Sequence, residues 1–377
     1  MKRDVKMATR AILQSVQQQY HALLMQGNTI FSLEQLFDSD QFAIREFCRS
    51  FRPHAHAPAL AQAARAFGEQ HGIWLETAEH YITCAIFLFT SADTARMMAI
   101  VENLAVDYYL NDTMGREVFG RLSSGQQRHA SMIIDRMGNI DVVQDDITAP
   151  HPVEIANRQV LQFMKETSPE AWFDQFLELY CYHVKVTHRN CNATEMGRIP
   201  SVAEYVDSRC HMAGMHHVIS LLEYSDGAFL DHAWLEAMGI MQPLKRLQYV
   251  TAAIGGLMND LFSFEKEVID NGADANLVMV LALNHPALTL EEVLLKACQQ
   301  VNGLLVEFQC LYNEVMSTCQ AAVAEHVIPA ASLHKHLEGL ERCVQASWVW
   351  QVHTARYKRA HSIWEETQLQ DVMARAV

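Results

Sequence analysis

The stretch GGLMNDLFSFEKEVID, residues 255–270, has the pattern of a helix with unexpected polar residues in it. Its many apolar residues are typical of a buried helix, yet Asn259, Ser263 and Glu267 stand at positions i, i+4 and i+8. That spacing places an amide, a hydroxyl and a carboxylate on one helix face, each about one turn from the next. Asn and Ser are weak helix formers, and buried polar groups need partners. The stripe therefore either bonds to neighbouring helices or binds a ligand.

The ligand interpretation of this stripe favours magnesium. Carboxylate, hydroxyl and amide oxygens are hard ligands of the kind that Mg²⁺ binds, and substrate phosphate oxygens often complete its coordination. Lys266 precedes Glu267 on an adjacent face, where its ammonium group could meet an anion beside the metal. Spacing alone leaves both interpretations open.

Composition excludes several classes of protein. The 377 residues are 50% hydrophobic and 19% charged, which predicts a large core. A net charge of -15 without a basic patch argues against binding to nucleic acid. No uncharged apolar run is long enough for a membrane span, and no secretory signal is evident. The nine scattered cysteines lack CxxC pairs, so we expect a cytoplasmic protein with reduced thiols.

Helical periodicity runs through nearly every long segment, and alternating strand patterns are absent. Pro-containing breaks, such as TAPHP at 148–152, fall between the segments. This pattern predicts one all-α domain over residues 1–377, with 1–45 as an N-terminal extension. The expected helices cover 59–68, 93–111, 152–165, 171–186, 202–224, 243–270, 290–320 and 330–359.

A second acidic segment, AVDYYLNDTMGRE at 105–117, ends an apolar helix. Asp107, Asn111, Asp112 and Glu117 could bind metal across a cavity from the first site, or simply mark a solvated helix end. The pair Asp145–Asp146 lies in a predicted loop without a nearby third acid, so we exclude it.

Two further segments carry candidate anion-binding groups. In EYVDSRCHMAG, 204–214, Arg209 lies one turn after Tyr205, and Gly214 would permit a helix break. An arginine in an apolar helix either pairs with an acid or donates to a phosphate. Arg356 and Tyr357 stand together near the C-terminus, where they either donate to an anion or belong to an ordinary terminal helix.

Together these segments resemble the microbial class I terpene synthases. Residues Asn259, Asp260, Ser263, Lys266 and Glu267 match every defining position of the family's second metal motif, (N/D)Dxx(S/T)xx(K/R)E. The resemblance covers roughly residues 50–360. The other matching elements are the Arg356–Tyr357 pair, the sensor helix with Tyr205, Arg209 and Gly214, the segment RPHAHA at 52–57, and Asn276.

The chain departs from the family at two places. The first metal motif, usually DDxx(x)(D/E), here reads NDTMGRE from Asn111 to Glu117. The resemblance therefore implies Asp112 as the expected ligand, with Asn111, Glu117 and Asp107 as weaker alternatives. The sensor sequence RRxTxG is reduced to Arg209 followed by Cys210, so Arg209 takes the sensor role unless the alignment slips by one residue.

The resemblance implies a single helical bundle around an apolar active-site cavity. Three Mg²⁺ ions would bind to Asp112, Asn259, Ser263 and Glu267, and the substrate diphosphate would meet Arg209, Lys266, Arg356 and Tyr357, with Gly214 at the helix break. The implied reaction ionises a prenyl diphosphate, geranylgeranyl or farnesyl with a slight preference for the former, and cyclises the cation. Homodimers are common in this family.

Rival interpretations remain open. An isoprenyl diphosphate synthase shares the fold class but normally carries two DDxxD motifs, and a non-catalytic helical scaffold would need no metal. A histidine-based metalloenzyme would draw on the 19 histidines. Their clusters, His54 with His56 and His211 with His216 and His217, lack an HExxH pattern.

Overall fold

The structure is a computed structural model that describes residues 2–26, 31–140, 150–188 and 193–369. Within these ranges the chain is helical, and its β-structure is limited to three isolated bridges. The helices are α1 (Lys2–Gln26), α2 (Leu33–Leu36), α3 (Ile44–Phe47), α4 (Ala57–Gln70), α5 (Glu79–Leu88), α6 (Thr94–Met114), α7 (Arg116–Phe119), α8 (Ser124–Arg136), α9 (Pro152–Glu166), α10 (Glu170–His188), α11 (Ala193–Met196), α12 (Val202–Met212), α13 (Met215–Asp226), α14 (His232–Ala237), α15 (Met241–Phe264), α16 (Leu277–Asn284), α17 (Leu290–Ala322) and α18 (Val327–His353). The shorter turns are η1 (Glu76–Ala78), η2 (Glu265–Asp270), η3 (Ala355–Tyr357) and η4 (Glu365–Thr367). The all-α prediction is confirmed.

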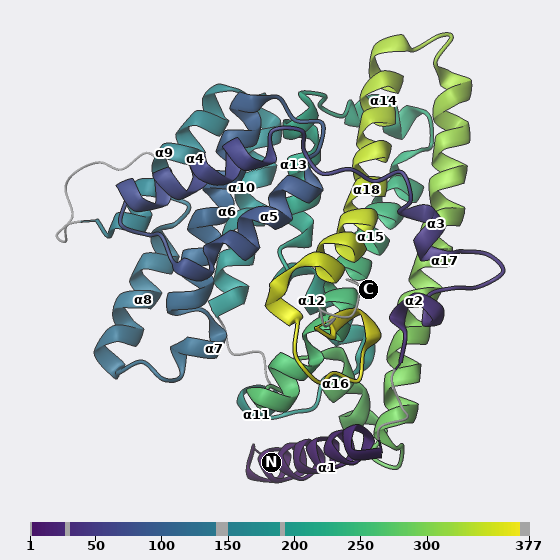
Figure 1. Ribbon diagram of the computed structural model, residues 1–377. Helices are drawn as coiled ribbons and strands as arrows, with labels where there is room; N and C mark the ends of the chain where they lie inside the picture. The colour runs from purple at the N-terminus through teal and green to yellow at the C-terminus, as the bar shows by residue number, and fades with distance from the viewer. Residues whose placement is uncertain (1, 27–30, 141–149, 189–192, 370–377) are drawn as a thin grey trace, which may run out of the picture.

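Helix α15 forms the centre of the bundle and packs against α12, α13, α17 and α18 (Figure 1). Two glycines let α12 and α13 approach it closely. A Cβ atom at Gly255 would lie 2.6 Å from the Cε of Met215, and one at Gly256 would lie 3.2 Å from the Cγ of Arg209. A larger residue at either position would require the Met215 or Arg209 side chain, both of which line the cavity, to move.

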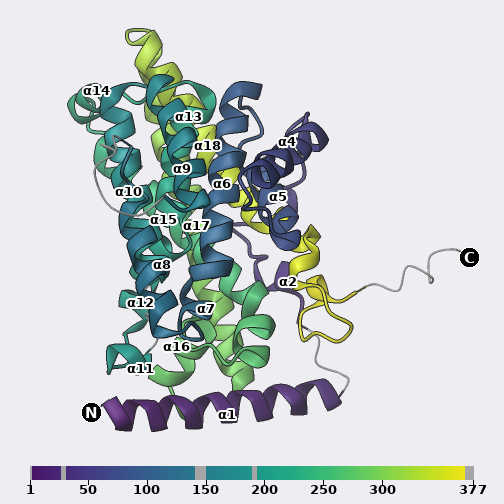
Figure 2. The same cartoon turned by 90° about the vertical axis from the view of Figure 1, so that its left-hand side faces the viewer.

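Helix α1 lies across one end of the bundle in both views (Figures 1 and 2). It packs on α11, α16 and the turn η2. The predicted extension at 1–45 thus begins with a helix that contacts the body of the protein.

Three predicted helices were too long. The segment 202–224 divides at Gly214, whose φ of 71° ends one helix and starts the next. The segment 243–270 continues beyond Phe264 as a π-helical turn, η2. Helix α18 ends at His353, so Arg356 and Tyr357 lie in a separate 3₁₀ turn capped by the side chain of Thr354. Apolar periodicity continues across all three breaks, which is why it could not reveal them.

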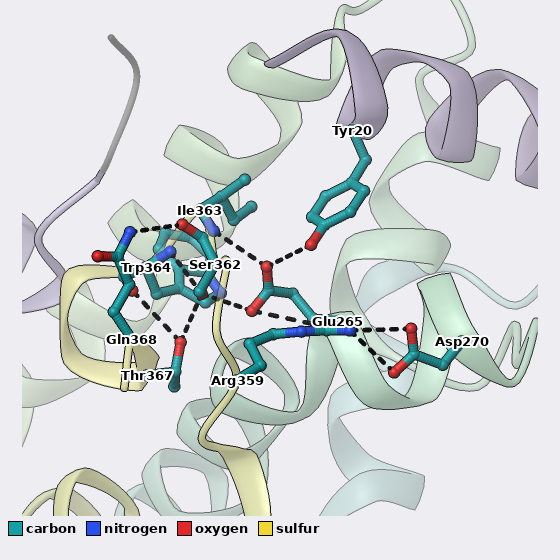
Figure 3. A network of polar contacts seen from close by, with 9 residues as sticks. All are labelled: Tyr20, Glu265, Asp270, Arg359, Ser362, Ile363, Trp364, Thr367 and Gln368. Carbon is teal, nitrogen blue, oxygen red and sulfur yellow. Dashed lines mark hydrogen bonds and ion pairs between the residues drawn. The ribbon is translucent and has the colours of Figure 1, made fainter. Parts of the chain in front are cut away.

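The turn η2 is fixed by a buried carboxylate. Glu265 is 2% exposed and accepts hydrogen bonds from the Tyr20 hydroxyl at 2.7 Å, the Ser362 hydroxyl at 2.5 Å and the Ile363 amide at 3.0 Å. Arg359 lies 4.0 Å from Glu265 and bonds to Asp270 at 3.0 Å. We call these contacts the Glu265 network; Figure 3 shows that it joins α1 and the C-terminal segment to η2.

None of the helices in the described ranges is long and apolar enough to cross a membrane.

Candidate active site

A cavity opens between the helices around α15, and most of the predicted site residues lie on its wall. Its polar lining consists of Asp107, Asn111, His183, Thr187, Arg209, His217, Asn259, Glu267, Ser347, Gln351, Arg356 and Tyr357. Its apolar lining includes Leu88, Leu104, Met212, Met215, Val218 and Trp350. The expected cavity with polar groups and an apolar remainder is therefore present.

The side chain of Asn259 joins three of the predicted segments. Its Oδ1 accepts a hydrogen bond from Arg209 Nη2 at 2.8 Å. Its Nδ2 donates to the Tyr357 hydroxyl at 2.8 Å and to Gln351 Oε1 at 3.1 Å. Residues separated by 50 and 98 positions in sequence thus meet at one amide on the cavity wall.

The guanidinium of Arg209 is held by Asp260, a residue whose role the sequence did not reveal. Asp260 is fully buried and accepts bonds from Arg209 Nε at 2.7 Å, the Tyr205 hydroxyl at 2.6 Å and the Leu277 amide at 2.8 Å. Burial alone would lower the pKa of Arg209, but the Asp260 carboxylate raises it above its ordinary value. The arginine therefore stays charged, with Nη2 directed to Asn259 at the cavity. The only sequence feature that indicated an ion pair here was an arginine within an apolar helix.

The groups of the metal motif fit a hard cation. Ser263 is 1% exposed, and its hydroxyl has no hydrogen-bond partner among the described residues. Glu267 lines the cavity one turn later and accepts a bond from Asn276 Nδ2 at 3.3 Å. A buried hydroxyl without a partner is costly unless something else binds it. Together with the Asn259 amide, these groups form the all-oxygen set that Mg²⁺ prefers.

The opposite wall comes from α6. Asp107 and Asn111 line the cavity, whereas Asp112 does not. Asp112 accepts bonds from the Asn111 amide at 3.0 Å and from the Thr77 hydroxyl at 3.4 Å. The side chain of Glu117 and the pair Asp145–Asp146 lie outside what the structure describes.

Within the described residues, no three His, Cys, Asp or Glu side chains come close enough to hold a metal by themselves. A metal bound here would need the amide and hydroxyl of the motif and oxygens from a substrate. This finding also gives the histidine-based metalloenzyme no support. His54, for example, is buried and bonds to the carbonyl of Ala92.

Besides Asp112, three predicted residues do not belong to the lining of the cavity. Ser263 is buried within α15, Lys266 is half-buried within η2, and Gly214 occupies the break between α12 and α13. The break places Met215 and His217 on the wall, although nothing in the sequence distinguishes His217 from its neighbours His211 and His216.

Comparison with known proteins decides the family. Residues 109–306 match the model of terpene synthase family 2, C-terminal metal binding. The chain belongs to the terpene synthase family. The matched region carries Asn111 and the α12, α13 and α15 sides of the cavity, whereas Asp107, the α18 side and the Arg356–Tyr357 pair lie outside it.

Known terpene synthases resemble the chain over much of its length. Pristinol synthase of Streptomyces pristinaespiralis is 22% identical over 58% of this chain and 60% of its own length. (+)-T-muurolol synthase of Streptomyces clavuligerus, described as farnesyl diphosphate cyclizing, is 25% identical over 62% of this chain and 53% of its own. The chain thus matches somewhat more than half of the length of these relatives. The germacradien-4-ol synthase structure from Streptomyces citricolor has a TM-score of 0.65 at 16% identity, covering 80% of this chain and 96% of that one. The fold is therefore that of the class I terpene synthases.

Proposed function

We propose that this chain is a Mg²⁺-dependent terpene cyclase, which ionises a linear prenyl diphosphate and cyclises the resulting cation to a hydrocarbon or alcohol. The observation that carries the proposal is the meeting of Arg209, Asn259 and Tyr357 at one place on the wall of a cavity that also presents apolar side chains. A charged region suits a diphosphate, and apolar surface suits an isoprenoid chain.

Each polar group in this region has a distinct task in the proposal. Arg209, kept charged by Asp260, donates to the diphosphate, because its planar fork matches phosphate oxygens. Arg356 and Tyr357 donate from the turn after α18, and both line the cavity. Lys266 adds positive charge from η2. These donors stabilise the negative charge that develops on the diphosphate as the C–O bond breaks.

The proposed metal ligands are Asn259, Ser263 and Glu267 on α15 and η2, with Asp112 and Asn111 on α6. Three bound Mg²⁺ ions would supply positive charge to the leaving diphosphate oxygens. We leave Asp107 out of this set because its carboxylate already bonds to His183 Nε2 at 3.0 Å.

The rest of the wall protects the cation. Leu88, Leu104, Met212 and Val218 present apolar surface to the cavity, which excludes water that would quench an allylic cation. The indole ring of Trp350 also lines it, and an aromatic face stabilises a nearby positive charge. The indole N–H of Trp350 donates a hydrogen bond to the Thr83 hydroxyl at 3.0 Å.

The test is incubation of the purified protein with geranyl, farnesyl and geranylgeranyl diphosphate, each with Mg²⁺ or with EDTA, followed by GC–MS of the extract. The two longer substrates are the expected ones. A cyclic product that requires Mg²⁺ supports the proposal and fixes the chain length. A longer prenyl diphosphate, formed only when isopentenyl diphosphate is added, would make the protein an elongating synthase. No turnover by folded protein would favour a non-catalytic scaffold.

A further inference from the structure

One polar side chain on the cavity wall has no task in the reaction described so far. His217 is 1% exposed and lines the cavity from the first turn of α13. Neither of its ring nitrogens has a hydrogen-bond partner among the described residues. A buried imidazole with two unsatisfied nitrogens is unusual, since nearly all buried polar atoms are paired.

The groups that surround His217 direct their own donors elsewhere. The Tyr180 ring lies 5.8 Å away edge-on, and its hydroxyl donates to Asn157 at 2.8 Å. The ring of His183 lies 4.6 Å away, and its two nitrogens lie 2.9 Å from the His211 carbonyl and 3.0 Å from Asp107. A polar partner for His217 must therefore come from the contents of the cavity.

The environment keeps His217 neutral. Because both nitrogens of His183 face acceptors, its network assigns it as an imidazolium. Burial alone would lower the pKa of His183, but Asp107 raises it above its ordinary value. Burial, and then the neighbouring charge of His183, lower the pKa of His217 to about 3. An available lone pair thus faces the cavity at any ordinary pH.

The helix break fixes the position of this imidazole. Gly214 has a φ of 71°, and a Cβ there would lie 2.7 Å from His217 Cε1 and 3.2 Å from His183 Cε1. Only a glycine allows the backbone to turn at this point while the ring rests against it. The break at Gly214 therefore holds the His217 ring against the backbone on the cavity wall.

From this arrangement we propose that His217 is a catalytic residue, the proton acceptor of the step that ends cyclisation. The inference rests on the proposed function. In that step the C–H bond next to the final cationic carbon breaks, and its electron pair forms the C=C bond of the product. The proton passes to the lone pair of a His217 nitrogen. The cation becomes a neutral alkene, the imidazole becomes an imidazolium, and the proton leaves to solvent after product release.

The direction of this transfer follows from the chemistry of both partners. A tertiary carbocation is a far stronger acid than an imidazolium, so even an imidazole of lowered basicity accepts its proton. A water molecule held by His217 would instead attack the cation and give an alcohol. Product analysis distinguishes the two outcomes.

The experiment compares His217→Phe and His217→Asn with a matched control, His216→Phe. His216 is the preceding residue, is half-buried and does not line the cavity. Diphosphate release and products are measured with whichever of farnesyl or geranylgeranyl diphosphate the wild type consumes. We expect diphosphate release to persist in both His217 variants, while formation of the native alkene falls about 10²-fold and other products replace it. The control should keep the native profile.

Several results would overturn the proposal. A native product profile in both His217 variants would make the residue a packing or water-binding group, as would an equal change in the control. A native product that is an alcohol would replace the alkene-forming step by hydration. If the variants unfold, judged by circular dichroism, His217→Ala is assayed with added imidazole or with pyrrole, a ring of the same size that has no basic nitrogen lone pair. Restoration of the native alkene by imidazole alone supports the proposal, and equal effects of the two oppose it. Wild type that releases no diphosphate would instead refute the proposed function.

Discussion

On the α15 side of the cavity, Asp260 is fully buried and accepts bonds from Arg209, Tyr205 and Leu277, whereas on the α6 side Asp112 is partly exposed and its bond from Thr77 is 3.4 Å long. The first wall is assembled before any ligand arrives. The second presents neutral Asn111 and the Asp107–His183 pair to the cavity, whereas Asp112 does not line it. The motif carboxylate of α6 is therefore held by fewer and longer bonds than that of α15.

The largest effect is expected at the α15 wall. Glu267→Ala or Asn259→Ala removes a proposed oxygen ligand of the metal, so kcat/KM should fall about 10³-fold, the upper range for one charge-stabilising group. Steady-state assays with varied Mg²⁺ measure this. Glu291→Gln, an exposed carboxylate in the first turn of α17, is the control and should behave as wild type. Activity near wild type in either variant would show that the metal assignment is wrong.

The comparison also predicts a difference in stability. Asp260→Ala leaves the charge of Arg209 buried without its partner, which should lower the free energy of unfolding by about 3–5 kcal/mol. Asp112→Ala should lower it by less than about 1 kcal/mol, because a partly exposed polar group contributes little. Urea denaturation of both variants measures the difference. Equal losses would mean that the two walls are equally preorganised.

The activity of Asp112→Ala tests the α6 wall directly. We expect kcat/KM to fall about 10–100-fold, the size of effect seen when a supporting group of a metal site is lost. A loss as large as that of Glu267→Ala would make the two walls equivalent. No loss would move the ligand role to Asn111 or Glu117.

Asn111→Asp tests whether the α6 wall takes part in metal binding, because it adds a carboxylate that faces the cavity. Because ligand charge tunes the affinity for divalent ions, the Mg²⁺ concentration at half-maximal activity should fall roughly tenfold. Titration of activity with Mg²⁺ checks this, and Asn111→Leu serves as the uncharged control. An unchanged requirement would show that residue 111 does not reach the metal.

The smallest effect is expected from Tyr20→Phe. It removes one of the bonds to the buried carboxylate of Glu265, so the free energy of unfolding should fall by about 1 kcal/mol. Activity should stay close to wild type, because Ser362 and Ile363 still hold Glu265. Thermal denaturation measures the loss of stability, and kcat measured on the same variant shows whether activity changes with it. A large loss of kcat would mean that α1 positions the metal motif.

The sequence predicted what depends on local spacing. Of the three residues in the i, i+4, i+8 pattern, Asn259 and Glu267 line one cavity and Ser263 is buried without lining it. The sequence could not predict the pairing of Arg209 with Asp260, because 51 residues separate them and only the packing of α12 on α15 joins them. The unpaired nitrogens of His217 could not be predicted for a similar reason, because they depend on which residues Tyr180 and His183 bond to in the folded protein.

The Glu265 network has a consequence for how the protein is made. Ser362, which bonds to Glu265, is synthesised 97 residues after it. At about 5–20 residues per second, the ribosome needs about 5–20 s to reach it. During that interval the turn that carries Glu267 lacks its C-terminal partners, and Arg356 and Tyr357 do not yet exist. The cavity is also incomplete during that interval, because Ser347, Trp350 and Gln351 of α18 belong to its lining. The last part of the wall and the charged groups beside it are therefore added together, at the end of synthesis.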